Sequence, residues 1–231
     1  MTSTPSPIKT LLFVLLLLAG AFGAANPQLP LTGGGLGQAG PDTPADLPSL
    51  ADFTRQVQNG NAAQVVGIYV DSVLAYPVVA QPNGQPGFVS TQEGVVTRFG
   101  MADAYGSLGF LAHNYLAGSV FSDLTDGDVV IVVFGDGHYA GFKIERMRRF
   151  QATNPLSPYS NFIDQATGAT LTANELFFQT YGVPDRLVLQ TCIASNGNDS
   201  WGRLFVIAAP LEPAELVRIT AADPPRAWKF E

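Results

Sequence analysis

Short runs rich in Val, Ile and Tyr recur along this chain from residue 65 onward, and Gly, Pro, Asn and Asp punctuate the segments between them. The runs lie at 65–70, 72–79, 93–99, 129–134, 139–144, 187–192 and 203–208. Short strands that recur between turn signals predict an all-β barrel or sandwich. A chain of 231 residues has room for one such domain of ordinary size plus a tail.

Two segments carry helix signals instead. Ser49 begins the first, at 49–57, where apolar residues follow at helical spacing. The second, at 172–182, has Thr172 as its N-cap, Glu175 three positions on, and Gly182 as its stop. It belongs to a long insert at 145–185, whose earlier part is a Pro/Ser/Asn-rich loop.

The N-terminal part of the chain is expected to direct export. Residues 1–25 have a polar start with one cation, Lys9, and then an uncharged apolar stretch, and Gly23 and Ala25 suit a signal-peptidase site. Because a bilayer span needs roughly 20 apolar residues, a cleaved signal peptide and an uncleaved membrane anchor both stay open. Either one would put the folded domain outside the membrane.

A Pro/Gly-rich linker at 26–48 follows the export element and is expected to act as a flexible tether. The remaining residues, 49–231, form the predicted domain. The net charge of −7 argues against a nucleic-acid-binding surface.

Cys192 is the one cysteine of the chain, and it ends the apolar run at 187–192. Arg203 starts the next run, after a turn rich in Asn, Gly and Asp, so the two runs predict a β-hairpin. A thiol and a guanidinium would then face one small volume, where the cation favours thiolate and can stabilise an oxyanion. The alternative is a buried structural cysteine that acts as a small hydrophobic residue.

Three further motifs precede or surround Cys192. His113 stands in an Ala-His-Asn block, Phe121 begins an F-x-x-L-x-x-G-D entry to the strand at 129–134, and Leu-Gln-Thr-Cys ends the cysteine strand at 189–192. With the downstream Arg203, these motifs resemble a sortase, the family of bacterial cell-surface cysteine transpeptidases. The resemblance covers residues 65–212. Ala112 and Asn114 beside the histidine depart from the common pattern.

The resemblance implies a mainly β fold, a closed sortase-type barrel of about eight strands with short helices in its connections. It also implies that Cys192 cleaves an LPxTG-like sorting signal through a thioester and transfers it to an amine on the cell envelope or on a pilin. His113 would be the general acid–base, Arg203 would stabilise the oxyanion, and Thr191 would help to bind substrate. No metal or organic cofactor is implied.

The resemblance also bears on two other segments. The insert at 145–185 would form one wall of the substrate groove, and the candidates on its helix are Leu176, Phe177, Phe178 and Tyr181, which could equally pack against the barrel. Residues 29–33 read Leu-Pro-Leu-Thr-Gly, which has the form of the sorting motif itself. A chance match, a pseudo-substrate in cis and a self-processing site all stay open.

The remaining polar groups have simpler interpretations. His138 follows a Gly-Asp-Gly turn and is expected at a solvent-exposed hairpin tip. The aspartates at 123, 126 and 128 do not have calcium-loop spacing, and the arginines at 146, 148 and 149 are expected on a solvated face. Two other functions stay open: a secreted cysteine peptidase that uses water, and a non-catalytic exported β-barrel that binds peptide or cell-wall components.

Overall fold

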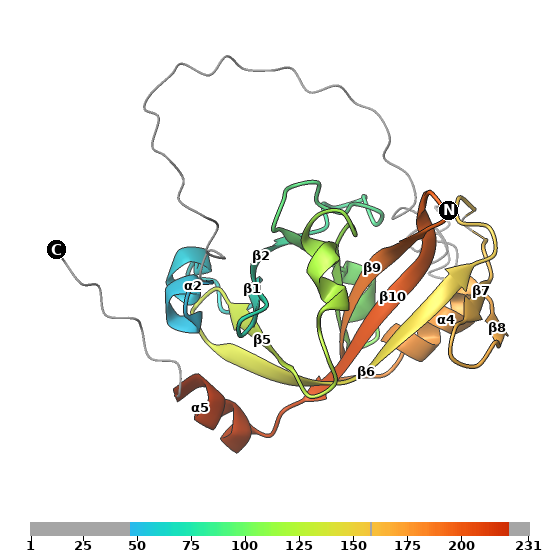
Figure 1. Ribbon diagram of the computed structural model, residues 1–231. Helices are drawn as coiled ribbons and strands as arrows, with labels where there is room; N and C mark the ends of the chain where they lie inside the picture. The colour runs from blue at the N-terminus through green and yellow to red at the C-terminus, as the bar shows by residue number, and fades with distance from the viewer. Residues whose placement is uncertain (1–46, 158, 222–231) are drawn as a thin grey trace, which may run out of the picture.

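The computed structural model describes residues 47–157 and 159–221, and in this part the chain folds into one β-barrel with short helices around it (Figure 1). The elements in chain order are α2 (Leu50–Val57), β1 (Val65–Val70), β2 (Leu74–Ala80), β3 (Val96–Arg98), α3 (Gly100–Asp103), β4 (Leu108–Leu111), the 3-10 helix η2 (Ala117–Ser122), β5 (Val129–Phe134), β6 (Tyr139–Ala152), β7 (Phe162–Asp164), β8 (Thr170–Leu171), α4 (Ala173–Tyr181), β9 (Leu187–Ser195), β10 (Asn198–Pro210) and α5 (Pro213–Ala221).

The export element predicted at 1–25, the Leu-Pro-Leu-Thr-Gly segment at 29–33 and all but the last two residues of the linker predicted at 26–48 lie outside the described residues. Every helix within 47–157 and 159–221 is too short or too polar to cross a bilayer.

The sheet closes on itself. Its strands follow the order β10-β9-β4-β3-β2-β1-β5-β6, and β6 then pairs with β10 from Phe142 and Pro210 to Gln151 and Gly202. Eight strands of the described chain therefore form a closed barrel, and β7 and β8 extend the sheet beyond β6. This confirms the predicted fold class. Closure leaves no free edge along the barrel wall, which removes a surface that could pair with another chain.

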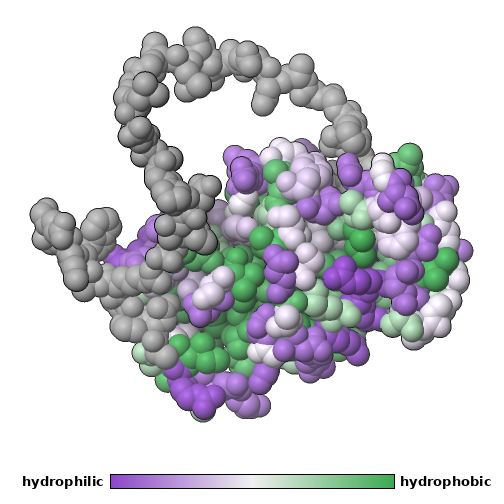
Figure 2. All heavy atoms as spheres, viewed as in Figure 1, coloured by the Kyte–Doolittle hydropathy of each residue, from purple (hydrophilic) through white to green (hydrophobic). Residues whose placement is uncertain are grey.

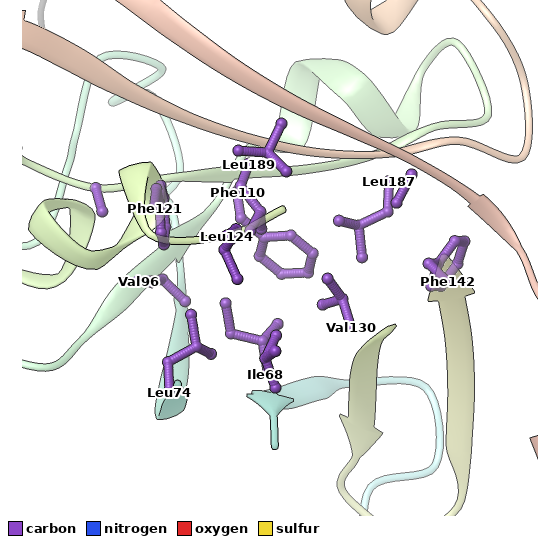
Figure 3. Packing of buried hydrophobic residues seen from close by; sticks show 14 of the residues in the cluster. Ile68, Leu74, Val96, Phe110, Phe121, Leu124, Val130, Phe142, Leu187 and Leu189 are labelled. Atoms are coloured by element: carbon purple, nitrogen blue, oxygen red, sulfur yellow. The ribbon is translucent and has the colours of Figure 1, made fainter. Parts of the chain in front are cut away.

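The barrel interior is filled by alternate residues of the strands, because successive side chains of a strand point to opposite faces. Figure 3 shows Leu187 and Leu189 of β9 packing with Phe110, Ile68 and Val130 from other strands. Phe121 and Leu124, from η2 and the turn after it, are also part of this core. Even-numbered residues of β9, including Cys192, therefore face outward.

The outward face of β9 and β10 is covered by α4, which explains why both faces of these strands are buried. Thr172 and Glu175 form the predicted capping box at the helix start. Phe177 and Tyr181 are buried in a second core together with Cys192, whereas Phe178 is 41% exposed. Gly182 ends the helix as predicted, although its φ of −78° is right-handed. Glycine is required for space, since a Cβ there would lie 2.6 Å from the Phe178 oxygen.

The strand boundaries differ from those predicted in several places, and β9 and β10, at Leu187–Ser195 and Asn198–Pro210, are longer than the runs at 187–192 and 203–208. β2 and β3 are shorter than the runs at 72–79 and 93–99, and β6 continues to Ala152, well past the end predicted at residue 144. The extension of β6 is polar in sequence because one side of it faces solvent. A prediction based on runs of apolar residues therefore misses it.

The helices α2 and α5 lie on the opposite side of the barrel from α4 (Figure 1). Ser49 caps α2 as predicted and accepts a hydrogen bond from the Asp52 backbone. Figure 2 shows hydrophobic residues gathered on this face beside α2 and α5. A groove of about 560 Å³ lies here, and Leu50, Tyr69 and Ile219 contribute to its lining.

Candidate active site

The site is built on two neighbouring parallel strands, β4 and β9, which end at the same end of the barrel. Leu111 is the register partner of Gln190, and the Ala112 N–H continues the ladder by donating to the Gln190 carbonyl at 3.1 Å. Continued two residues past the end of β4, the same register would bring His113 level with Cys192, on segments spaced roughly 4.8 Å apart. Residues 79 positions apart in the chain are thus brought to one place.

A second contact ties the histidine segment to the hairpin formed by β9 and β10. The Asn114 side-chain amide donates to the Asp199 carbonyl at 3.1 Å. Asp199 lies between Cys192 and Arg203 in the chain, so this bond attaches the segment that follows His113 to the hairpin that carries the other two predicted site residues.

Cys192 and Arg203 are direct register partners across the antiparallel β9–β10 pair. Directly opposed residues of such a pair share a face of the sheet, with Cβ atoms about 4.5–5.5 Å apart. Arg203 is only 1% exposed, and its Nη1 donates to the Ser200 and Gly202 carbonyls at 3.0 and 2.8 Å. These bonds hold the guanidinium beside the thiol, and its buried Nε has no partner among the described residues.

Burial sets the protonation states of the thiol and the imidazole. Desolvation raises the pKa of Cys192, although nearby Arg203 and a hydrogen bond with Ser200 act in the opposite direction. Desolvation lowers the pKa of His113, against the effect of a hydrogen bond with the Val89 backbone. Both groups are therefore predominantly neutral at pH 7, and the thiolate–imidazolium pair is a minor form.

Two residues that the sequence analysis did not single out support His113. The Tyr115 ring stacks on the imidazole with centroids 5.2 Å apart, and this tyrosine is 60% exposed, so it covers His113 from the solvent side. Gly118 donates its N–H to the His113 carbonyl at 3.0 Å. A Cβ on Gly118 would lie 2.8 Å from that carbonyl and would overlap the Thr191 hydroxyl. No spacing rule identifies such a glycine, because the overlap depends on a strand far away in sequence.

Thr191 lies on the opposite face of β9 from Cys192. Its register partner is Leu204 of the barrel core, and its hydroxyl is buried with no partner among the described residues. A role for Thr191 in substrate binding stays a prediction.

His138 lies at the tip of the β5–β6 hairpin, as predicted. It pairs with Asp136 and stacks on Phe134, with ring centroids 4.1 Å apart, so the contacts of its side chain stay within that hairpin. Its side chain is 49% exposed.

Other predicted polar features can be placed as well. The described residues contain no group of three or more His, Cys, Asp or Glu side chains that could hold a metal ion. The solvated face predicted for the arginines of β6 is wrong for Arg148, which pairs with Asp164 at 2.7 Å and donates to Gln179 of α4. Arg148 therefore ties α4 and β7 to the barrel.

If Cys192 is acylated with His113 as its acid–base, as the sequence predicts, these protonation states give a broad bell-shaped pH profile. Activity should fall at acid pH, below the ordinary histidine pKa of 6.5, where a protonated His113 can no longer take the thiol proton. It should fall again above the ordinary cysteine value of 9.0, where neutral His113 faces a thiolate and has no proton to give. Measuring kcat/KM and the rate of Cys192 alkylation by iodoacetamide across this range checks both limbs.

The His138→Ala variant is the control for this pH profile, because His138 contacts neither Cys192 nor Arg203. The acid and alkaline limbs of its profile should coincide with those of the wild type. An alkylation pKa below 9.0 would contradict the neutral pair and indicate a stable thiolate–imidazolium pair.

Comparison with known proteins gives matches among solved structures. No family model matches the chain, and no curated protein matches it. Sortase C1 from Streptococcus suis aligns with a TM-score of 0.45 at 12% identity, over 71% of this chain and 78% of that one. Sortase C-1 from Actinomyces oris gives 0.45 at 16% identity, over 75% and 83%. Sortase A from Listeria monocytogenes gives 0.41 at 13% identity, over 69% and 99%. The chain is thus similar to sortases, the family that its sequence motifs resemble.

Proposed function

We propose that this protein is a cysteine transpeptidase of the sortase type, which cleaves an LPxTG-like signal and transfers it to an amine. The observation that carries the proposal is the register pair of Cys192 and Arg203, with His113 two residues past the last pair of the parallel β4–β9 ladder. A thiol, a fixed guanidinium donor and an imidazole are the groups that acyl transfer through a thioester requires.

Acylation would begin when the Cys192 sulfur attacks the carbonyl carbon of an extended peptide. His113 takes the thiol proton and gives it to the leaving amine, while Arg203 donates hydrogen bonds to the developing oxyanion. The Nε of Arg203 suits this role because it is buried and has no partner among the described residues, whereas Nη1 is engaged by the Ser200 and Gly202 carbonyls. An incoming amine would then resolve the thioester.

An extended peptide would reach Cys192 beside α4 and β7, which cover the rest of the outward face of β9. Phe162 of β7 lies against Arg203, with the guanidinium carbon 6.0 Å from the ring centroid. Phe178 is the aromatic residue of α4 that remains 41% exposed, and it could bind an apolar substrate residue. Leu176, Phe177 and Tyr181 are fully buried and instead hold α4 on the barrel.

Export is part of the proposal and is supported by the sequence of residues 1–25. The protein would act on the outer side of the cell membrane, either held there by an uncleaved N-terminal segment or released. The Leu-Pro-Leu-Thr-Gly segment at 29–33 could then reach the site through the Pro/Gly-rich linker.

The test is to incubate the full-length protein with a Leu-Pro-Leu-Thr-Gly peptide and a small amine, with the products read by mass spectrometry. We expect an amine-linked product in the wild type and in His138→Ala. The rate should fall about 10²–10⁴-fold in His113→Ala, which loses the general acid–base. Cleavage without amine transfer would favour a peptidase that uses water. Absence of any thioester across several signal variants would favour a binding protein without catalysis.

A further inference from the structure

A polar pocket of about 220 Å³ borders the end of β9. It lies between η2 with the turn before it, β6, β9 and β10, and Cys192 is one of its ten lining residues. Thr191 and Leu204 in its wall belong to the face of the hairpin opposite to α4. Because Cys192 lines this pocket, a second substrate bound in it would lie beside a thioester on the sulfur.

Arg149 supplies the one charge in the pocket lining. Its side chain is exposed and makes no hydrogen bond or ion pair with the described residues, whereas the neighbouring Arg148 is fully engaged by Asp164 and Gln179. No carboxylate lies among the lining residues. Because the chain carries a net charge of −7, this cation is a local feature that would attract an anion against the charge of the whole molecule.

The neutral groups of the pocket favour a different partner from Arg149, namely a hydrogen-bond donor. The Ser119 and Ser122 hydroxyls already donate their protons, to the Leu116 and Ser119 carbonyls at 2.7 and 3.1 Å. The Asn114 amide nitrogen is likewise engaged with Asp199. What the two serines still offer to a ligand are oxygen lone pairs, and Asn114 offers its Oδ1 together with one N–H, so most of these groups accept hydrogen bonds from N–H donors.

We propose that this pocket binds the acceptor substrate, and that the acceptor is an amine that also carries a carboxylate. Arg149 binds the carboxylate, for which the planar guanidinium fork is suited. The oxygens of Ser119, Ser122 and Asn114 accept hydrogen bonds from the amine. This inference rests on the proposed function and names the substrate class of its second step.

The step that follows uses groups already described. The amine nitrogen forms a C–N bond with the thioester carbonyl carbon, and the C–S bond to Cys192 breaks. The nitrogen loses one proton to His113, which passes it to the Cys192 sulfur. The products are an amide and the free thiol, so the enzyme returns to its starting state.

Binding is tested first, without any sorting peptide. Glycylglycine is titrated into the ¹⁵N-labelled full-length protein, and its amide, glycylglycinamide, serves as the probe that lacks the carboxylate. We expect glycylglycine to shift the backbone amides of Ser119, Ser122 and Ala194 and the Nε–H of Arg149. The shifts should weaken at least severalfold with the amide probe or in Arg149→Gln. Absence of shifts up to the solubility limit, or equal shifts with both probes, overturns the proposal.

The matched control variant is Arg146→Gln, which removes the same charge from the same strand at an exposed residue outside the pocket lining. It should bind glycylglycine as the wild type does. If both variants weaken binding equally, the effect comes from the overall charge of the protein, and the pocket is excluded as the binding site of glycylglycine.

Transfer rates then connect the pocket with the reaction. In the wild type, glycylglycine should resolve the thioester faster than its amide by about fivefold, the order expected for a partly exposed ion pair. Arg149→Gln should bring this ratio to about one, and Arg146→Gln should keep it. A ratio that is unchanged in Arg149→Gln overturns the proposal, whereas pocket shifts without any thioester would mean that the proposed function fails and the amine–carboxylate site stands.

Discussion

Replacement of Cys192 by alanine is expected to abolish thioester formation and all turnover while leaving the protein folded. The covalent intermediate needs the sulfur, and no other cysteine exists in the chain to replace it. The side chain is 4% exposed and packs in the core beneath α4, where alanine removes one atom and leaves a small cavity. We expect a cost of about 1 kcal/mol at neutral pH.

The dependence of thermal stability on pH in the alkaline range distinguishes this variant from the wild type. The pKa of Cys192 is higher in the folded protein than its ordinary value of 9.0, so the contribution of the neutral thiol to stability is complete below that pH. It is lost as the pH rises through the folded pKa. The Tm of the wild type should therefore fall relative to that of Cys192→Ala above pH 9.0.

Intact-protein mass spectrometry with the peptide substrate, together with thermal unfolding across this pH range, checks both statements. A thioester adduct on the alanine variant would show that another residue is the nucleophile. Parallel Tm curves would show that the thiol is not desolvated in the folded state.

Replacement of Arg203 by alanine is expected to have the second largest effect, and it acts in two ways. Loss of the donor to the oxyanion should lower kcat about 10²–10³-fold. The same change leaves the buried carbonyls of Ser200 and Gly202 without the guanidinium that they accept from. Each unsatisfied carbonyl costs about 1–3 kcal/mol, so the free energy of unfolding should fall as well.

The conservative variant Arg203→Lys separates these contributions. It keeps a positive charge beside Cys192 but lacks the planar fork that reaches two carbonyls and an oxyanion together. Since Arg203 lowers the pKa of Cys192, the thiol pKa should rise in the alanine variant and change less in the lysine variant. Rates measured well below each Tm, with thiolate absorbance followed against pH, would show this order. A thiol pKa that is the same in all three proteins would remove Arg203 from the site.

Local patterns were enough to predict several parts of this molecule. The β9–β10 hairpin, with Cys192 and Arg203 in register, follows from two apolar runs around an Asn/Gly/Asp turn. The helix α4 follows from the capping box of Thr172 and Glu175. Both depend on residues close together in sequence, so a short segment of the chain is enough to predict each of them.

Features that depend on distant segments were harder to predict. The parallel pairing of β4 with β9 places His113 and Cys192 at the same end of the barrel, and no local signal selects that partner for a four-residue strand. The long β6 is polar along its outer side, so its pairing with β10, and with it the different surroundings of Arg148 and Arg149, could not be derived from an apolar run. The pattern of short strands predicted either a barrel or a sandwich. The resemblance to sortases was needed to choose the closed barrel.

The β4–β9 ladder also has a consequence for the order in which the protein acquires reactivity. The hairpin that carries Cys192 and Arg203 closes a short loop and can form early, whereas the ladder that aligns His113 must close a loop of 79 residues. Contacts of such high sequence separation form late and slow the folding of β-rich domains. Under the proposed function, His113 would therefore reach the thiol only with the final cooperative step, so a chain still folding would carry an unassisted cysteine and would not acylate itself prematurely.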